Sequence, residues 1–292
     1  MKINKKKLLT SFLKIVLSIF LLYFVFTKIS FIEIWKTVKS VKAYYLLLAV
    51  LFFILSQWVS AKRFLLFLKE SGYHLSSKSN YILYLIGMFY NFFIPGGIGG
   101  DAYKIYILNK NFGWNIKKLT ASVFLDRFMG LTAIGVLILI LAFQMLEVLG
   151  LKSAISLGLI PLGILLIIVI SFFFSKHFFP LFINIYKKTL AYSFVIQLLQ
   201  VLSVICIILS LGDSTNFINY ILIFLVSSVL SIFSFSGIGI REYVFYQASL
   251  WLGIESSTAV SIGLLFSIST AFVSLFGILY HYSNPKLILS KR

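Results

Sequence analysis

Long uninterrupted apolar segments are the feature that most constrains the fold of this chain. Runs such as 119–146 and 189–211 reach or exceed the roughly 20 apolar residues with which a helix crosses a bilayer. Of the 292 residues, 60% are hydrophobic and 12% are charged, whereas a soluble domain carries about 25% charged residues. The runs are too continuous for a transmembrane barrel, whose strands alternate polar and apolar residues. The chain is therefore predicted to be an all-α polytopic membrane protein without a soluble domain.

About eight hydrophobic segments are expected, of which six are full crossings and two are broken, re-entrant hairpins. The expected crossings lie at about 8–27, 43–61, 119–146, 154–174, 189–211 and 257–282. The first run follows a lysine cluster and ends without a small-residue cleavage site, so it is interpreted as an uncleaved span rather than a secretory signal. Segment 28–42 places apolar residues among lysines and fits a short interfacial helix. The hairpins, 81–116 and 217–253, have apolar arms that stop at glycines; these arms are 81–94, 102–108, 217–235 and 243–253.

The charges of the chain are strongly unbalanced. Twenty-six Lys and Arg residues against eight Asp and Glu residues give a net charge of +18. These cations lie in short loops beside apolar runs, which favours topology signals and contacts with anionic lipid over nucleic-acid binding. Nearly every basic loop is cytoplasmic if hairpin 81–116 enters from the cytoplasm and hairpin 217–253 from outside; segment 28–42 is the exception. Both termini are then cytoplasmic, in a bacterial or archaeal cytoplasmic membrane.

Two glycine-rich breaks interrupt the hydrophobic pattern in similar ways. Residues 91–101 read NFFIPGGIGGD and residues 234–242 read SFSGIGIRE, so each contains Gly-Ile-Gly followed by a carboxylate. The residues expected in the broken-helix loops are Pro95, Gly96, Gly97, Gly99, Gly100, Gly237 and Gly239. Paired interruptions of this kind point to the midplane site of a transporter with inverted repeats, here a first repeat at about 43–146 and a second at about 154–282. The alternative is a structural kink, since glycine also allows close helix packing.

Five charged residues lie in or beside the apolar segments, namely Asp101, Asp126, Arg127, Arg241 and Glu242. A charge at the centre of a span costs about 2.5–3.5 kcal/mol, so these groups are expected to pair or to line a hydrated cavity. Arg127 and Arg241 are predicted to face an anionic group, with Asp101 and Glu242 holding them or meeting a cationic group. Alternatively, Asp126 lies near the interface and its neighbour extends its charged end to water.

Other polar residues contribute less to the predicted chemistry. Gln57, Gln197 and Gln200 are weaker candidates for a cavity wall, because an amide can simply bond across a helix pair. Cys206 is the single cysteine, and His74, His177 and His281 are far apart in the sequence. No metal site and no cofactor are therefore expected. Neither glycine break fits a phosphate-binding P-loop, because no Lys-Ser/Thr pair follows at the required spacing.

Three motifs resemble those of a known family. The 91–101 stretch with Tyr103, the Asp126-Arg127-x-x-Gly130 stretch and the Gly237-x-Gly239-x-x-Glu242 stretch look like the flippase-like transmembrane domain of lysylphosphatidylglycerol synthases. The resemblance spans nearly the whole chain and implies a domain that moves an amphiphilic lipid between leaflets. It adds Asn91 and Tyr103 to the candidate substrate-binding residues. Only residues 283–292 follow the last span, so a stand-alone member without the soluble aminoacyl-transferase domain is expected.

The leading functional hypothesis is therefore a lipid flippase-like transporter rather than an enzyme. The expected substrate is a phosphate-containing amphiphile, such as a phospholipid, an aminoacylated phospholipid or a polyprenyl-linked lipid. The expected partners are membrane lipids, with a homo-oligomer or a lipid-modifying enzyme as further associations. One alternative is an intramembrane glycosyl- or aminoacyl-lipid transferase, and another is an accessory or scaffold subunit of a lipid-modifying pathway.

Overall fold

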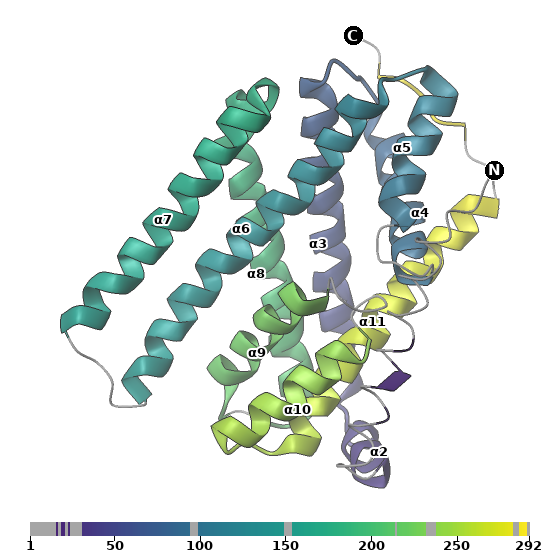
Figure 1. Ribbon diagram of the computed structural model, residues 1–292. Helices are drawn as coiled ribbons and strands as arrows, with labels where there is room; N and C mark the ends of the chain where they lie inside the picture. Colours follow the sequence, from purple (N-terminus) through teal and green to yellow (C-terminus); the bar gives the residue numbers. More distant parts are fainter. Residues whose placement is uncertain are drawn as a thin grey trace. The chain divides into compact units, whose positions relative to one another are not determined.

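The computed structural model describes residues 31–93, 99–148, 154–213, 215–231, 238–282 and 286–290, with isolated positions between 16 and 23. This described part is helical except for short turns and one isolated β-bridge, as Figure 1 shows. Its elements are α2 (Phe31–Lys39), α3 (Ala43–Glu70), α4 (Ser77–Phe93), α5 (Gly99–Phe112), α6 (Ile116–Val148), α7 (Ala154–Phe178), η1 (Pro180–Ile185), α8 (Tyr186–Ser210), α9 (Phe217–Leu230), α10 (Ile240–Leu252) and α11 (Ser256–Tyr282).

Five of the described helical segments are long and apolar enough to cross a membrane. They are Ala43–Glu70, Ile116–Ala142, Gly158–Phe178, Pro180–Ser210 and Ser256–Tyr282. These segments correspond to five of the six predicted crossings, and they confirm an all-α polytopic membrane protein. The first predicted crossing, 8–27, lies outside the described residues apart from isolated helical positions.

The predicted arms of the two hairpins are also helical, although their bounds differ from the expectation. Helices α4 and α5 extend beyond 81–94 and 102–108, because polar residues such as those of Ser77–Asn80 continue the helix past the apolar run. Helices α9 and α10 replace the arms 217–235 and 243–253. Segment 28–42 contains the short helix α2, with Ile34 buried and Trp35 half exposed. Re-entry into the bilayer and the interfacial position of α2 stay predictions.

Contacts between residues divide the chain into two compact units. Unit 1 comprises Met1–Ile54, Leu85–Tyr103 and Gln200–Asn284, and unit 2 comprises Leu55–Tyr84, Lys104–Leu199 and Pro285–Arg292. Each unit therefore combines stretches that are distant in the sequence, and helices α3, α4, α5 and α8 contribute to both. This division by contacts does not test whether 43–146 and 154–282 are repeats related by symmetry, so the two repeats stay a prediction.

Unit 1 is held together by unusually close backbone contacts at two glycines. A Cβ atom at Gly100 of α5 would overlap the carbonyl group of Gly87 in α4. A Cβ atom at Gly277 of α11 would overlap the carbonyl oxygen of Leu85 in α4. Small residues allow membrane helices to approach each other in this way, and van der Waals packing then replaces the hydrophobic effect as the driving force. Helix α4 is thus packed tightly against both α5 and α11.

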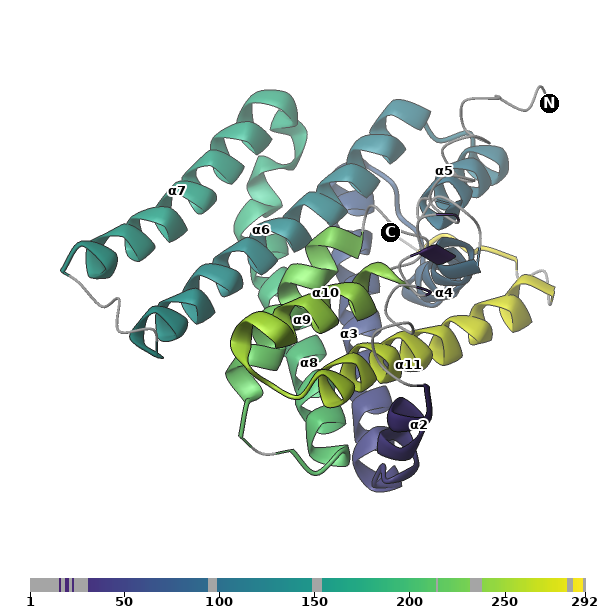
Figure 2. The same cartoon turned by 60° about the horizontal axis from the view of Figure 1, so that its bottom comes forward.

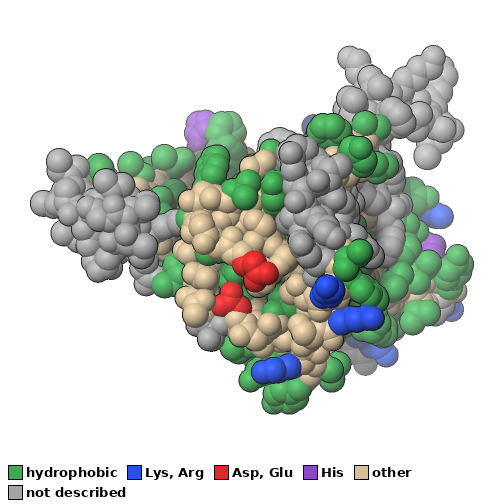
Figure 3. Space-filling view, turned by 90° about the horizontal axis from the view of Figure 1, so that it is seen from below, with side chains coloured by type: hydrophobic (Ala, Val, Ile, Leu, Met, Phe, Trp, Pro, Cys, Tyr) green, Lys and Arg blue, Asp and Glu red, His purple; other side chains and the backbone are tan. Residues whose placement is uncertain are grey.

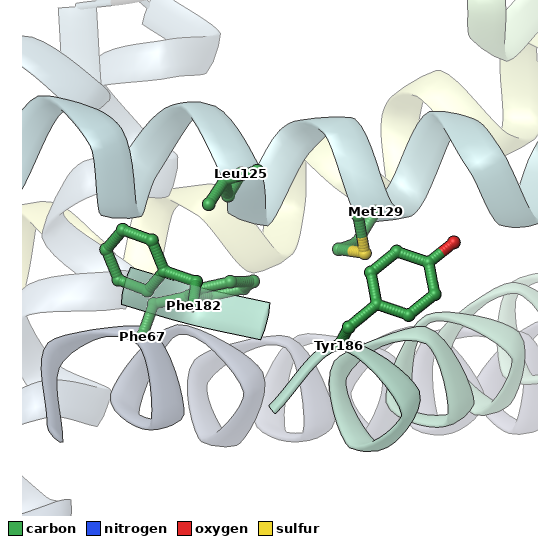
Figure 4. Close-up of a cluster of buried hydrophobic side chains, with 5 residues drawn as sticks. All are labelled: Phe67, Leu125, Met129, Phe182 and Tyr186. Atoms are coloured by element: carbon green, nitrogen blue, oxygen red, sulfur yellow. The ribbon is translucent and has the colours of Figure 1, made fainter. Parts of the chain in front are cut away.

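Unit 2 contains a separate apolar core around the junction of η1 and α8. Phe67, Leu125, Met129, Phe182 and Tyr186 form the buried cluster drawn in Figure 4. The rings of Phe67 and Phe182 meet edge to face with centroids 5.7 Å apart, a favourable aromatic geometry. Helix α7 lies beside α6 in Figures 1 and 2 and leaves most of its apolar side chains exposed, as a helix in contact with lipid does.

Candidate functional site

The second glycine break positions a carboxylate at the start of α10. Gly239 has a φ of +85°, a conformation that glycine adopts without steric cost. Its backbone N–H donates to the Oε2 atom of Glu242 at 2.7 Å. A carboxylate at the third helical position stabilises the unpaired N–H groups and the positive end of a helix. The Gly239-x-x-Glu242 spacing is therefore a helix start, built at a point where Ile240, Arg241 and Glu242 are all buried.

Arg241 and Glu242 are joined through a serine of α11. The Nη1 atom of Arg241 donates to the Ser267 hydroxyl at 2.8 Å, and this hydroxyl donates to Glu242 Oε1 at 2.9 Å. The guanidinium also lies over the ring of Phe266, 4.9 Å from its centroid, a cation–π arrangement. Figure 3 shows charged side chains exposed on one face of the molecule, whereas Arg241 and Glu242 are only 6% and 1% exposed. The predicted burial of this charged pair is confirmed.

Helix α11 approaches Arg241 closely because position 263 is a glycine. A Cβ atom at Gly263 would lie 3.1 Å from the Phe245 ring and 3.4 Å from the Cγ atom of Arg241. A side chain at this position would therefore require the Phe245 ring to shift by a few tenths of an ångström. The small residue at 263 brings the Ser267 hydroxyl within reach of both charged groups.

The Nε atom of Arg241 is the exception in this network. It is buried and has no hydrogen-bond partner among the described residues. Buried polar atoms normally have a partner, so an unsatisfied donor of this kind requires an explanation. A planar guanidinium is well suited to bind a carboxylate or phosphate oxygen. The arrangement therefore retains one donor of a buried cation for an anionic group or for water.

The first glycine break is closed by an asparagine. Asn91 Oδ1, at the end of α4, accepts a hydrogen bond of 2.9 Å from the backbone N–H of Gly100 in α5. Gly99, Gly100 and Asp101 form the first turn of α5, and Asp101 is buried. A carboxylate in the first turn complements the helix dipole. Asn91 thus links the two helices on either side of the break.

Aromatic side chains gather beside this break. Tyr103 of α5 and Tyr90 of α4 have ring centroids 4.6 Å apart, and the Tyr90 hydroxyl lies 3.3 Å from the ring nitrogens of His281 in α11. Helix α11 therefore contacts the second break through Ser267, and it contacts α4 just before the first break through Gly277 and His281. Ser267 and Gly277 are separated by about 15 Å along the helix axis. Both breaks and α11 belong to unit 1.

Asp126 belongs to unit 2, and its partner is a residue that the sequence interpretation missed. Arg63 Nε donates to Asp126 Oδ1 at 2.8 Å, and Arg63 Nη1 donates to the hydroxyl of Ser193 at 2.7 Å. Arg63 and Asp126 are each 5% exposed. The signal was present in the apolar residues after Arg63, which continue α3 to Glu70. Gly130, which belongs to the same motif as Asp126, lies against the Arg63 guanidinium.

Arg127 differs from the buried Asp126 beside it, in agreement with the alternative that the neighbour of Asp126 extends its charged end outward. Its side chain is exposed, whereas that of Asp126 is buried. Successive residues of an α-helix point about 100° apart, so neighbouring side chains diverge and the two charges do not share one environment. A role of Arg127 in substrate binding stays a prediction.

The remaining sequence candidates divide into described and undescribed residues. Pro95, Gly96, Gly97 and Gly237 lie outside the described residues. Gln57 donates to Ser56 at 3.1 Å, and the Oε1 atom of Gln197 is buried without a partner in the described part of the chain. Among the described residues, no group of three His, Cys, Asp or Glu side chains could hold a metal ion.

Long apolar helices that carry buried charged side chains define a polytopic helical membrane protein. The family model described as "Lysylphosphatidylglycerol synthase TM region" matches residues 11–277, and the chain belongs to this family. A relative, the UPF0104 membrane protein PH1989 of Pyrococcus horikoshii, is 23% identical over 297 residues. The match covers 84% of this chain and 89% of the relative.

Proposed function

We propose that this protein is a lipid flippase-like transporter that moves a phosphate-containing amphiphile between leaflets. The observation that carries the proposal is the buried guanidinium of Arg241, whose Nε donor has no partner among the described residues. Membership of the lysylphosphatidylglycerol synthase transmembrane family supports it. We further propose that the protein itself is not an enzyme and that it resides in the cytoplasmic membrane with both termini in the cytoplasm.

The physical task of such a transporter is to compensate for headgroup desolvation. A charged or polar headgroup loses strong hydrogen bonds with water when it enters an apolar environment. Arg241 offers a charge-assisted hydrogen bond to a phosphate oxygen, and such bonds are about twice as strong as neutral ones. The N-terminus of α10 beside it adds partial positive charge. The acyl chains meanwhile stay in the surrounding lipid.

Glu242 and Ser267 serve as positioning residues in this proposal. The serine bridge fixes the Nη1 side of the guanidinium, which directs the unused Nε toward the substrate. Because the sequence contains no nucleotide-binding motif, we propose that movement is driven by a gradient, by proton coupling through Asp101 or Glu242, or occurs passively.

The test is lipid translocation in reconstituted vesicles. Fluorescent phosphatidylglycerol is placed in the membrane, and the fraction accessible to an external quencher is followed over time. Arg241→Lys retains the charge but loses the planar guanidinium with its Nε donor. Arg241→Gln loses the charge. Both are expected to reduce the translocation rate at least tenfold, because a charge-assisted hydrogen bond of about 1.5–3 kcal/mol is lost.

The control is Lys176→Gln, which removes an exposed cation at the end of α7 and should leave the rate unchanged. Circular dichroism and size-exclusion chromatography establish that each variant is folded. Wild-type rates in both folded Arg241 variants would reject the proposal. A similar loss in Arg241→Lys and in the control would show that the assay reports general damage.

A further inference from the structure

One end of unit 2 carries a stack of three aromatic rings. Tyr73, after α3, lies parallel to Trp114, before α6, with ring centroids 4.4 Å apart and planes 4° from parallel. The ring of Phe112, at the end of α5, also stacks on the ring of Trp114, with centroids 4.9 Å apart. The Tyr73 hydroxyl accepts a hydrogen bond from the backbone N–H of Asn115 at 2.9 Å. These contacts fasten the α3–α4 loop to the α5–α6 loop.

The C-terminal tail is attached to the same loops. Ser76 donates its backbone N–H to Ile288 at 3.0 Å, and Ser290 donates to the carbonyl of His74 at 2.9 Å. The backbone N–H of Ile288 also donates to the Ser79 hydroxyl at 2.8 Å. Residues 286–290 therefore form a short strap across the α3–α4 turn, and Leu75 and Leu289 make an antiparallel bridge. These connections are at the upper end of Figure 1.

Lysines surround the aromatic stack and the strap. The six exposed lysines are Lys69, Lys78, Lys110, Lys117, Lys118 and Lys286, and we call them the lysine collar. Each lies within five positions of a residue of the stack or the strap. Glu70 is the one acidic residue in the loops 62–80 and 102–118. Six positive charges against one negative charge give the collar and Glu70 a net charge of +5.

Exposed apolar side chains accompany the collar. Ile116, Ile288 and Leu289 are exposed beside the lysines. The helix that leads to this end, α3, has 28 residues and is about 42 Å long, which exceeds the roughly 30 Å of the hydrocarbon core. An apolar surface that carries lysines beside the end of such a span fits the headgroup layer, where apolar groups enter the acyl boundary and lysines reach the phosphates.

We propose that the lysine collar and the aromatic stack form a docking site for anionic phospholipid headgroups of the surrounding bilayer. Anionic lipid is the expected occupant because its charge is complementary to the collar. Each lysine near an anionic membrane surface contributes about 1 kcal/mol of attraction. The aromatic stack and the strap hold the lysines together, although they come from three separate parts of the chain. This site is independent of the proposed transport and requires only that the protein is embedded in a membrane.

The test uses Trp114 as a reporter of nearby lipid. The chain contains four tryptophans, so the Trp35→Phe, Trp58→Phe and Trp251→Phe changes leave Trp114 as the sole emitter. The protein is reconstituted in phosphatidylcholine vesicles that contain a minor fraction of brominated phosphatidylglycerol or brominated phosphatidylcholine. Bromine quenches a neighbouring indole, so the ratio of the two quenching efficiencies reports selectivity for the anionic headgroup.

Brominated phosphatidylglycerol is expected to quench Trp114 more strongly than brominated phosphatidylcholine, and high salt should abolish the difference. Lys117→Gln with Lys118→Gln should lower the selectivity by up to about fivefold per lysine. Lys36→Gln with Lys39→Gln, on exposed positions of α2, is the matched control and should retain it. Equal quenching by the two lipids in the parent protein would overturn the proposal, as would equal losses in both double variants.

Discussion

The two units each bury an arginine, a serine and a carboxylate, but they connect these groups differently. In unit 2, Arg63 binds Asp126 directly through Nε and Ser193 through Nη1. In unit 1, Arg241 reaches its serine through Nη1, the serine bridges to the carboxylate, and Nε has no partner among the described residues. The same chemical groups therefore leave a donor available in one unit and engage the corresponding donor in the other.

This difference separates a structural ion pair from a candidate binding group. A buried pair with direct contact compensates much of its own desolvation, and it joins α3, α6 and α8 of unit 2 into one body. A buried guanidinium with an unpaired N–H donor carries the desolvation cost of that donor, which an acceptor on a ligand would relieve. Burial of charge alone would rank both arginines equally, whereas the hydrogen-bond partners distinguish them.

The largest expected effect is the loss of the direct ion pair. Asp126→Ala leaves the buried Arg63 with Ser193 as the remaining contact described above, and breaking a buried pair from one side costs about 3–5 kcal/mol. The free energy of unfolding, measured by denaturation in detergent micelles, should fall by this amount. The double variant Arg63→Met/Asp126→Leu replaces the pair with apolar groups and should recover most of the loss. A stable Asp126→Ala protein would contradict the structural assignment of this pair.

Glycines sharpen the contrast between the units. Gly100→Ala in unit 1 brings a methyl group against the backbone of Gly87, and overpacking against a backbone that cannot move aside should cost about 3 kcal/mol. Gly130→Ala in unit 2 meets the Arg63 guanidinium at an ordinary 3.6 Å and should change stability little. Thermal unfolding in one detergent compares the two variants directly. Equal unfolding midpoints for the two variants would show that α4 and α5 do not approach each other closely enough at Gly100 to exclude a methyl group.

The sequence predicts the helical architecture and the breaks because these features are local. Glycine and proline act on the backbone where they stand, and apolar runs of sufficient length identify spans without knowledge of neighbours. The Gly239-x-x-Glu242 spacing likewise contains its own contact. Long-range partners carry no such local signal, so the bridge between Leu75 and Leu289 was not anticipated.

Arg63 and Arg127 show where an interpretation from hydropathy fails. Lys62 and Arg63 end the apolar run that defines the second crossing, so they suggest a loop. The helix nevertheless continues to Glu70, with Lys62 exposed and Arg63 buried. The reverse holds at Arg127, which lies within an apolar run but is exposed. Which way a helix faces depends on its neighbours, and a single sequence does not specify them.

The serines provide the smallest and most discriminating comparison. Ser267→Ala removes the bridge between Arg241 and Glu242, and the loss of hydrogen bonds to two buried charges should cost about 2 kcal/mol. Ser193→Ala removes one hydrogen bond from Arg63, whose contact with Asp126 at 2.8 Å remains, and should cost about 1.5 kcal/mol, the lower end for a bond to a charged group. Both values are measured as changes in unfolding free energy under identical conditions. If Ser193→Ala is the more damaging change, unit 2 depends on its serine for stability, and the distinction between a satisfied and an unsatisfied arginine is wrong.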